Sequence, residues 1–381
     1  MAFLRLRSRV AVSLRTHKPP SQQLRRMNSM KMWSRDVDVV VDDFDAWILR
    51  VCGPPSSDCN DALLQMNGVG GDLMPASLVR CKQLLQHGCN LEIQWDANTA
   101  RLGVGYNLCY TRLQHSIAVS RLAGVWCDAH EAHKYDPLLR VALRLAALFH
   151  DVGHLALSHF GDFVARSIAS QRADGALIVP HEMRSMVECS RFISSYAEQC
   201  EHTRASLGGN AKKDNFRRHH AIKHLKRLAT CLINPGGVGP GIFVTAATSL
   251  LQGHAFESLS STTTDRMDID RCAYLAWDAP PQLQPAVRSA VQAWITTDCP
   301  RAERFLCDTR AALHRHVYEA SNARMAERWE RVLHSKDNKP ATATAAALYR
   351  DALQHNLPQL VDKDFADWGL GNATIVAKPW F

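Results

Sequence analysis

The chain has 381 residues, of which 46% are apolar and 22% are charged, a composition typical of a globular protein with one or two domains. No apolar run approaches the ~20 residues that cross a bilayer, so we expect no membrane insertion. The formal net charge is +8, but the first 35 residues hold nine of the 45 Lys and Arg and none of the 37 Asp and Glu, which leaves 36 basic against 37 acidic residues. The body of the protein is therefore electrically balanced.

The basic leader, residues 1–35, is rich in Arg, contains Ser and lacks acidic residues, as mitochondrial transit peptides do. A disordered basic tail, or a true start at Met27, Met30 or Met32, is the alternative. Twelve cysteines without a C-x-x-C pair indicate reduced thiols rather than disulfides or a zinc finger. We therefore favour the mitochondrial matrix, with the cytosol or the nucleus as alternatives.

Residues 36–77 form an N-terminal extension, in which acidic residues and turn formers predict a short helical element between loops. From Leu78 onward, apolar residues recur at intervals of three and four, which predicts amphipathic helices. These helices cover residues 78–86, 111–127, 136–151 and 181–199.

The polar, basic segment 201–240 predicts a surface helix followed by a flexible, Gly-rich loop. Helical periodicity returns over residues 284–298, 302–333 and 343–356, and an irregular tail begins at Leu357. Few runs of alternating β-branched residues are present. The predicted class is all-α, or nearly so.

The central chemical signal is the pair His150-Asp151 at the end of an apolar helix, followed by His154 and His159. An imidazole nitrogen beside a carboxylate oxygen suits Fe, Mn, Zn or a similar divalent ion. A His-Asp pair alone is more often solvated or part of a helix cap.

Three further features support a metal site. His115 lies on an apolar helix, one turn after Arg112. Two carboxylates, Asp268 and Asp270, precede an apolar run, and the pair His181-Glu182 begins a later helix. Alone, these features indicate a core histidine, a helix cap and a solvated face.

Together, the order H…HD…D resembles the HD phosphohydrolase superfamily, and more closely the HD-domain dNTP triphosphohydrolases, which include the SAM-and-HD-domain and bacterial dGTPase branches. The matching blocks are Arg112 to Ser116, His150 to His159, His181-Glu182, Asp268 to Asp278 and Thr309 to Tyr318. The resemblance implies an HD-domain helical bundle with peripheral helices. It places this domain at residues 78–335, with insertions near 89–105 and 201–245, before a C-terminal helix and tail at 336–381, and includes no SAM domain.

The resemblance implies that a divalent Fe, Mn, Zn or Mg ion is held by His115, His150, Asp151 and Asp270. Asp268 competes for the last place, but the spacing to the following Arg and Tyr favours Asp270. The ion would polarise the α-phosphate and activate a water molecule. The implied catalytic residues are Asp151, His154, His159 and His181, with His181 favoured as the acid that protonates the leaving 5′-oxygen.

The implied substrate contacts fall into three groups. Arg112, Arg271 and Arg310 would bind phosphate oxygens. Tyr274 and Asp278 would face the sugar, Gln83 the base and sugar, and Tyr318 the C2′ carbon, where a ribose hydroxyl would clash. His314 shares the helix face of Arg310 and Tyr318. Ala273 and Trp277 depart from the polar residues usual at their positions.

The expected reaction converts a deoxynucleoside triphosphate into deoxynucleoside plus triphosphate. A different HD enzyme, a 5′-deoxynucleotidase or a phosphodiesterase, is the first alternative, because it shares the metal ligands. A nucleic-acid-binding protein with a relic site is the second, on the strength of the basic stretch 211–228. A homo-oligomer is expected by analogy alone.

Overall fold

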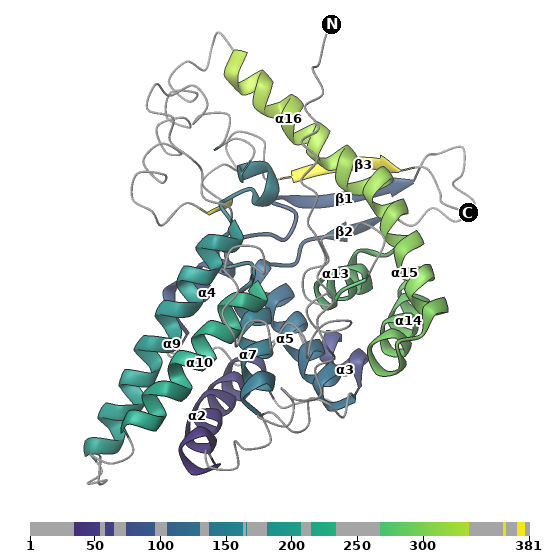
Figure 1. Cartoon of the computed structure of the whole chain (residues 1–381). Helices are drawn as coiled ribbons and strands as arrows, with labels where there is room; N and C mark the ends of the chain where they lie inside the picture. The colour runs from purple at the N-terminus through teal and green to yellow at the C-terminus, as the bar shows by residue number, and fades with distance from the viewer. Residues whose placement is uncertain are drawn as a thin grey trace, which may run out of the picture.

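The computed structural model describes residues 34–53, 58–64, 74–95, 105–129, 137–162, 165, 181–206, 215–233, 267–334, 361–362 and 372–377. They form a helical protein with one small sheet, which confirms the predicted all-α class (Figure 1). Residues 1–33 of the basic leader, the Gly-rich loop and the helix predicted at 343–356 lie outside these residues. Among the helices described, none is long and apolar enough to cross a membrane.

The core forms around two packed helices, α5 (Arg112–Ala129) and α7 (Pro137–Phe149). Proline at the first position of α7 suits a helix start, because its missing N–H would have no helical partner. Helix α5 is buried on all sides over most of its length, so it shows almost no amphipathic pattern. In Figure 1, α2, α9 and α10 lie on one side of this pair, and α13 and α14 lie on the other.

Within the segment 201–240, residues 215–233 are less exposed than predicted. Helix α9 (His181–Ser206) runs past residue 201, and α10 (Asn215–Ile233) packs against both α9 and α7. Helix α10 buries an apolar stripe at four-residue spacing, formed by Ala221, Leu225 and Ala229. The basic residues between the stripe positions concealed this face in the sequence.

The N-terminal extension also differs from its prediction, because α2 (Ser34–Cys52) is a long helix rather than a short element. Its buried residues include Phe44, Trp47 and Ile48, and the Trp47 ring centroid lies 4.2 Å from that of Phe192 on α9. The short helix α3 (Cys59–Leu64) follows it. Tertiary packing therefore stabilises α2 although its solvent side is acidic.

A three-stranded sheet joins the two ends of the described chain. Strand β1 (Asn90–Trp95) lies between β2 (Tyr106–Leu108), which is antiparallel to it, and β3 (Asn372–Ala377), which is parallel. The prediction of an irregular tail was therefore wrong for β3. A six-residue strand whose partner lies far away in the sequence gives almost no local signal.

The carboxyl-terminal helices follow the predicted periodicity. They are α13 (Ile269–Asp278), α14 (Gln284–Thr297), α15 (Pro300–Leu313) and α16 (Glu319–His334). The prediction of one helix over 302–333 missed a π-helical turn, η3 (His314–Tyr318), between α15 and α16. Such turns are frequent at functional sites, and this one carries two of the predicted substrate-binding residues.

Candidate metal centre and active site

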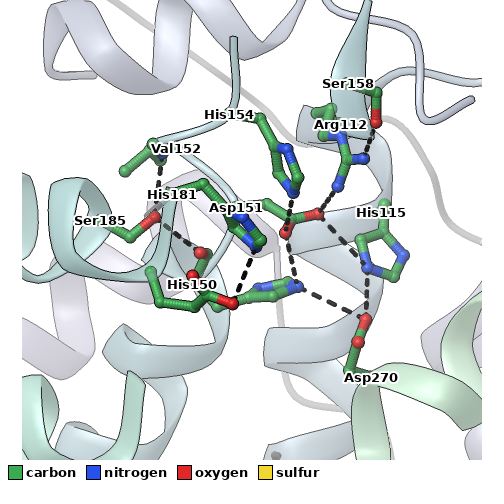
Figure 2. A network of polar contacts seen from close by, with 12 residues as sticks. Arg112, His115, His150, Asp151, Val152, His154, Ser158, His181, Ser185 and Asp270 are labelled. Carbon is green, nitrogen blue, oxygen red and sulfur yellow. Dashed lines mark hydrogen bonds and ion pairs between the residues drawn. The ribbon is translucent and has the colours of Figure 1, made fainter. Parts of the chain in front are cut away.

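Four side chains that the sequence predicts as metal ligands converge at the ends of three helices (Figure 2). His115 comes from α5, His150 and Asp151 follow α7, and Asp270 lies in the first turn of α13. Nε2 of His115 lies 2.7 Å from Oδ1 of Asp270, and Nε2 of His150 lies 3.4 Å from the same oxygen. Oδ1 of Asp151 lies 3.4 Å from Nε2 of His150.

The two separations of 3.4 Å fit one divalent ion, whereas the 2.7 Å contact between His115 and Asp270 is a hydrogen bond. Ligand atoms that each lie ~2.1 Å from an ion stand roughly 3–3.5 Å from one another. Nε2 of His150 is buried and lies 3.4 Å from one oxygen of Asp151 and one of Asp270, beyond a regular hydrogen bond, and an ion between these atoms would satisfy all three. Nδ1 of His150 lies 2.7 Å from the carbonyl oxygen of Ala147 and so must donate its proton there, which leaves Nε2 free to ligate.

Neighbouring charges determine the ionisation of Asp151, Asp270 and His150 in this cluster. Burial opposes the ionisation of Asp151, but Arg112 and His150 outweigh it and hold the pKa of this carboxyl well below its usual range. For Asp270, hydrogen bonds from His115 and His150 likewise outweigh desolvation and lower the pKa. Burial lowers the pKa of His150, yet the two carboxylates raise it to about 9. An ion would take the place of the proton that His150 then carries.

The two candidate carboxylates at α13 have different positions. Asp268 is the N-cap of α13, where its side chain accepts a hydrogen bond of 2.6 Å from the backbone N–H of Arg271. It also lies 3.2 Å from Nε of Arg271. Asp270 faces the histidines instead. At the start of α13, Asp268 therefore caps the helix, and Asp270 faces the candidate metal ligands.

Arg112 is more deeply buried than an arginine that only contacts a phosphate needs to be. Its guanidinium is buried and pairs with Oδ2 of Asp151. It also contacts the hydroxyl of Ser158 and donates to the carbonyl of Gln86 at 2.9 Å. Arg112 therefore orients Asp151.

A second cluster, formed by His154, His159, Asp162 and His181, lies beside the first. The rings of His154 and His181 stack with centroids 3.8 Å apart. Nε2 of His154 lies 3.3 Å from Oδ1 of Asp151, so the two clusters touch. The ligand atoms of the second cluster lie within 4.8 Å of one another, and this group could also hold a cation.

Asp162 is the residue of this cluster that the sequence prediction missed. Its Oδ2 lies 3.4 Å from Nδ1 of His181, and its Oδ1 accepts from Arg184 at 2.7 Å. The position of Asp162, three residues after His159, placed it on the same short helical turn and could have indicated it. The predicted partner of His181, Glu182, lies 3.5 Å from Nε2 on the opposite edge of the ring.

Gly153 brings His181 to the site by allowing α9 to approach the turn after α7. A Cβ at Gly153 would lie 2.1 Å from the carbonyl oxygen of His181 and 2.7 Å from the backbone nitrogen of Ser185. The Ser185 hydroxyl donates to the carbonyl of His150 at 2.6 Å and accepts from the N–H of Gly153 at 2.9 Å. The start of α9 is thereby fixed against the metal ligands.

Two tyrosines and a histidine surround Asp278, which is fully buried. The hydroxyls of Tyr110 and Tyr318 donate to its carboxylate at 2.7 Å and 2.5 Å, and Nε2 of His87 lies 3.2 Å away. Burial, followed by the Asp278 charge, raises the pKa of both tyrosines well above the usual range, so they stay protonated donors. The sequence prediction included Asp278 and Tyr318 but missed Tyr110 and His87.

The π-helical turn orients the predicted phosphate and sugar contacts. Nε of Arg310 donates to the Tyr274 hydroxyl at 3.0 Å. The rings of Tyr274 and His314 both stand edge-on to Tyr318, with centroids 6.0 Å and 5.1 Å away. The structure therefore brings Arg310, His314 and Tyr318 to one side, as the four-residue spacing predicted.

The structure places Gln83 away from the predicted substrate contacts, and it places Trp277 and Ala273 in apolar packing. The side chain of Gln83 is exposed, and the same segment reaches the site through the carbonyl of Gln86 and the ring of His87. Trp277, which departs from the usual polar residue, packs edge-on against Tyr110 at 4.5 Å. Ala273 is fully buried beside it on α13. These departures add apolar packing behind Asp278.

Comparison with protein-family models matches residues 112–225 to the HD domain. The chain contains an HD domain. The matched segment carries His115, His150 and Asp151, and all of the second cluster, but it ends before Asp270. No curated protein matches the chain significantly. The HD domain, together with its His and Asp cluster, points to a phosphohydrolase that uses a divalent metal.

Proposed function

We propose that this protein hydrolyses deoxynucleoside triphosphates to deoxynucleoside and triphosphate. The observation that carries the proposal is the arrangement of α13, where Asp270, Tyr274 and Asp278 follow one another at four-residue spacing. Such residues share one helix face, at steps of about 6 Å. Along this face, Asp270 is the proposed metal ligand, Tyr274 bonds Arg310, and Asp278 bonds Tyr318. This order suits a substrate with phosphate at one end and a sugar at the other.

When bound, a divalent ion would polarise a phosphate oxygen and lower the pKa of a water molecule. The chain's own residues hold this site in shape, because Arg112 orients Asp151 and the Ala147 carbonyl orients His150. Arg271 and Arg310 lie on the same side as the carboxylates of α13 and supply positive charge for the other phosphates.

His181 is the proposed proton donor to the leaving 5′-oxygen. Burial, together with Arg112 and His181, holds the pKa of His154 well below the usual range, so His154 is neutral at pH 7 and cannot supply a proton. Asp162 orients the His181 ring through Nδ1. The pairing leaves Nε2, which lies 3.5 Å from the Glu182 carboxylate, as the edge that would donate the proton.

We assign the selection of the sugar to the side chains around Asp278. Its carboxylate would accept the 3′-hydroxyl, and the Tyr318 ring would pack against C2′. An additional 2′-hydroxyl would have to displace packed aromatic groups, which disfavours ribonucleotides.

Product analysis tests this proposal. Purified protein is incubated with Mn²⁺ or Mg²⁺ and each of the four dNTPs or GTP, and the double variant His150→Ala/Asp151→Ala is the control. Release of intact triphosphate, lost in the double variant, supports the proposal. Orthophosphate or pyrophosphate would instead mean cleavage elsewhere in the chain of phosphates and would favour another HD hydrolase. Absence of turnover under all conditions would favour the nucleic-acid-binding alternative.

The leader and the assembly state belong to the same proposal. We propose that residues 1–35 direct the protein to the mitochondrial matrix and that the folded protein is a homo-oligomer. A reporter fused to residues 1–35 tests import, and light scattering of the purified full chain tests assembly. A cytosolic reporter and a monomeric mass would contradict these two points.

A further inference from the structure

A carboxylate from the far C-terminal part of the chain reaches two loops of the active site. Asp362 is buried, with 5% of its surface exposed. Its Oδ2 accepts a hydrogen bond of 2.5 Å from the backbone N–H of Leu85, and its Oδ1 accepts one of 2.6 Å from that of Leu157. The two bonds span 277 and 205 positions of the sequence. One side chain thus joins two loops that are far apart in the chain.

Each of the two loops contacts the guanidinium of Arg112 through the residue that follows the one bonded to Asp362. The residue after Leu85 is Gln86, whose carbonyl accepts from Nη2 of Arg112 at 2.9 Å. The residue after Leu157 is Ser158, whose hydroxyl contacts the same Nη2 and donates to the Gln86 carbonyl at 3.0 Å. Each bond of Asp362 therefore lies one residue away from a contact of the guanidinium that orients Asp151.

The second loop has a backbone that needs such support. Leu157 and Ser158 have φ angles of 64° and 60°, in the left-handed region that disfavours residues with a Cβ. The two loops also touch closely, because a Cβ at Gly88 would lie 2.5 Å from the Leu157 carbonyl oxygen. Without an acceptor at Leu157, the buried N–H would lose its partner and the strained turn would relax.

We propose that Asp362 is a positioning residue for the metal centre, which fixes the loops of Leu85 and Leu157 and, through Arg112, the orientation of Asp151. The inference rests on the proposed metal site and not on the proposed substrate. Burial raises the pKa of Asp362 to about 6, so the group is ionised at neutral pH and both oxygens accept. Arg112 and Arg80 are the charged groups that favour this ionised form.

The test compares Asp362→Asn and Asp362→Ala with the control Asp128→Asn in the full-length protein. Asn keeps the side-chain volume but turns an N–H donor toward one of the two backbone donors. Asp128 is half-exposed, pairs with Arg140 on the surface at 3.1 Å and lies at the opposite end of α5 from His115. Three quantities are measured: amide hydrogen exchange of Leu85 and Leu157, the visible absorption spectrum of the Co²⁺-loaded protein, and kcat and KM.

We expect faster exchange at both amides and an altered Co²⁺ spectrum in both Asp362 variants, because the spectrum reports the geometry of the metal ligands. Misplacement of a reacting group by about 1 Å costs up to about 100-fold in rate, so kcat should fall roughly 10- to 100-fold with KM little changed. The control should match the wild type in all three measurements.

Several results would overturn this role. An unchanged Co²⁺ spectrum and kcat, with or without faster exchange, would show a structural contact only. A kcat that falls in proportion to the folded fraction, with the spectrum per bound Co²⁺ unchanged, would do the same. If the wild type turns over no dNTP, the proposed function fails, whereas the spectrum and the exchange rates still decide the role of Asp362.

Discussion

Oδ1 of Asp270 lies 2.7 Å from Nε2 of His115, although 155 positions separate the two residues. His115 lies within the HD match and Asp270 lies beyond its end. The contact therefore places a carboxylate of α13 beside His115, one of three candidate metal ligands that the matched segment carries.

We predict that Asp270→Ala lowers the affinity for the divalent metal by at least about 100-fold and abolishes turnover, because it removes a candidate ligand and a carboxylate that contacts both His115 and His150. The matched change Asp268→Ala should cost about 1 kcal/mol of stability through loss of the N-cap, while the protein still binds about one metal ion. Metal content by mass spectrometry and denaturant unfolding distinguish the two variants. Equal metal loss in both would contradict the assignment.

Gly153 and Gly124 provide a second matched pair. Gly153→Ala should destabilise the protein by about 1–3 kcal/mol or more and displace the start of α9, because the new Cβ meets backbone atoms at 2.1 Å and 2.7 Å. Gly124→Ala should change stability by less than about 1 kcal/mol, since its Cβ would lie 3.5 Å from the flexible Arg144 side chain. Urea unfolding of both variants checks this. A Gly153→Ala protein as stable as the wild type would contradict the close approach.

Metal affinity should depend on pH through His150. The pKa of this histidine is raised in the metal-free protein from 6.5 to about 9, so its contribution to folding stability is complete below pH 6.5 and is lost as the pH rises through 9. Metal binding requires the neutral ring and displaces this proton. Apparent affinity should therefore rise with pH by up to about tenfold per unit until pH 9 and then level off.

Calorimetry in two buffers of different ionisation enthalpy measures the protons released on metal binding. We expect about one proton per ion at pH 7.5. The surface variant His202→Ala is the control and should release the same number. An affinity that stays constant between pH 6.5 and 8.5, with no proton release, would show that His150 is already neutral in the metal-free protein.

Tyr318 should govern the choice of sugar. Tyr318→Phe removes the hydrogen bond to Asp278 and should raise KM for dNTPs by about five- to tenfold, equivalent to about 1 kcal/mol. Tyr318→Ala also removes the ring and should lower the dNTP preference over NTPs at least about tenfold. Tyr196→Phe loses a hydroxyl that bonds Arg50 away from the site and is the control. Unaltered discrimination in Tyr318→Ala would remove this residue from the sugar pocket.

The sequence predicted α7, which leads into the site, because this helix has a strong local pattern. Helix α7 has a Pro start and a continuous apolar face, and it ends at the His150-Asp151 pair. The residues Asp270, Tyr274 and Asp278 share one face through simple four-residue spacing. The order of these motifs also predicted which side chains should meet.

The sequence could not predict features whose partners lie far away along the chain. The length of α2 depends on aromatic packing with α9, and β3 depends on parallel pairing with β1. Similarly, Tyr110 and His87 looked like ordinary aromatic and polar residues until the fold placed them around Asp278. Their roles come from distance in space, which periodicity does not encode.

The sequence by itself therefore determined the helical class, because short-range spacing specifies helix faces, and its resemblance to HD enzymes supplied the candidate metal ligands. Tertiary structure alone decided that Asp268 caps a helix while Asp270 faces the histidines, and that Asp162 orients His181. It also decided that Asp362 joins two active-site loops. The physical reason is that a buried carboxylate acquires its role from the donors around it, and here those donors come from distant segments of the chain.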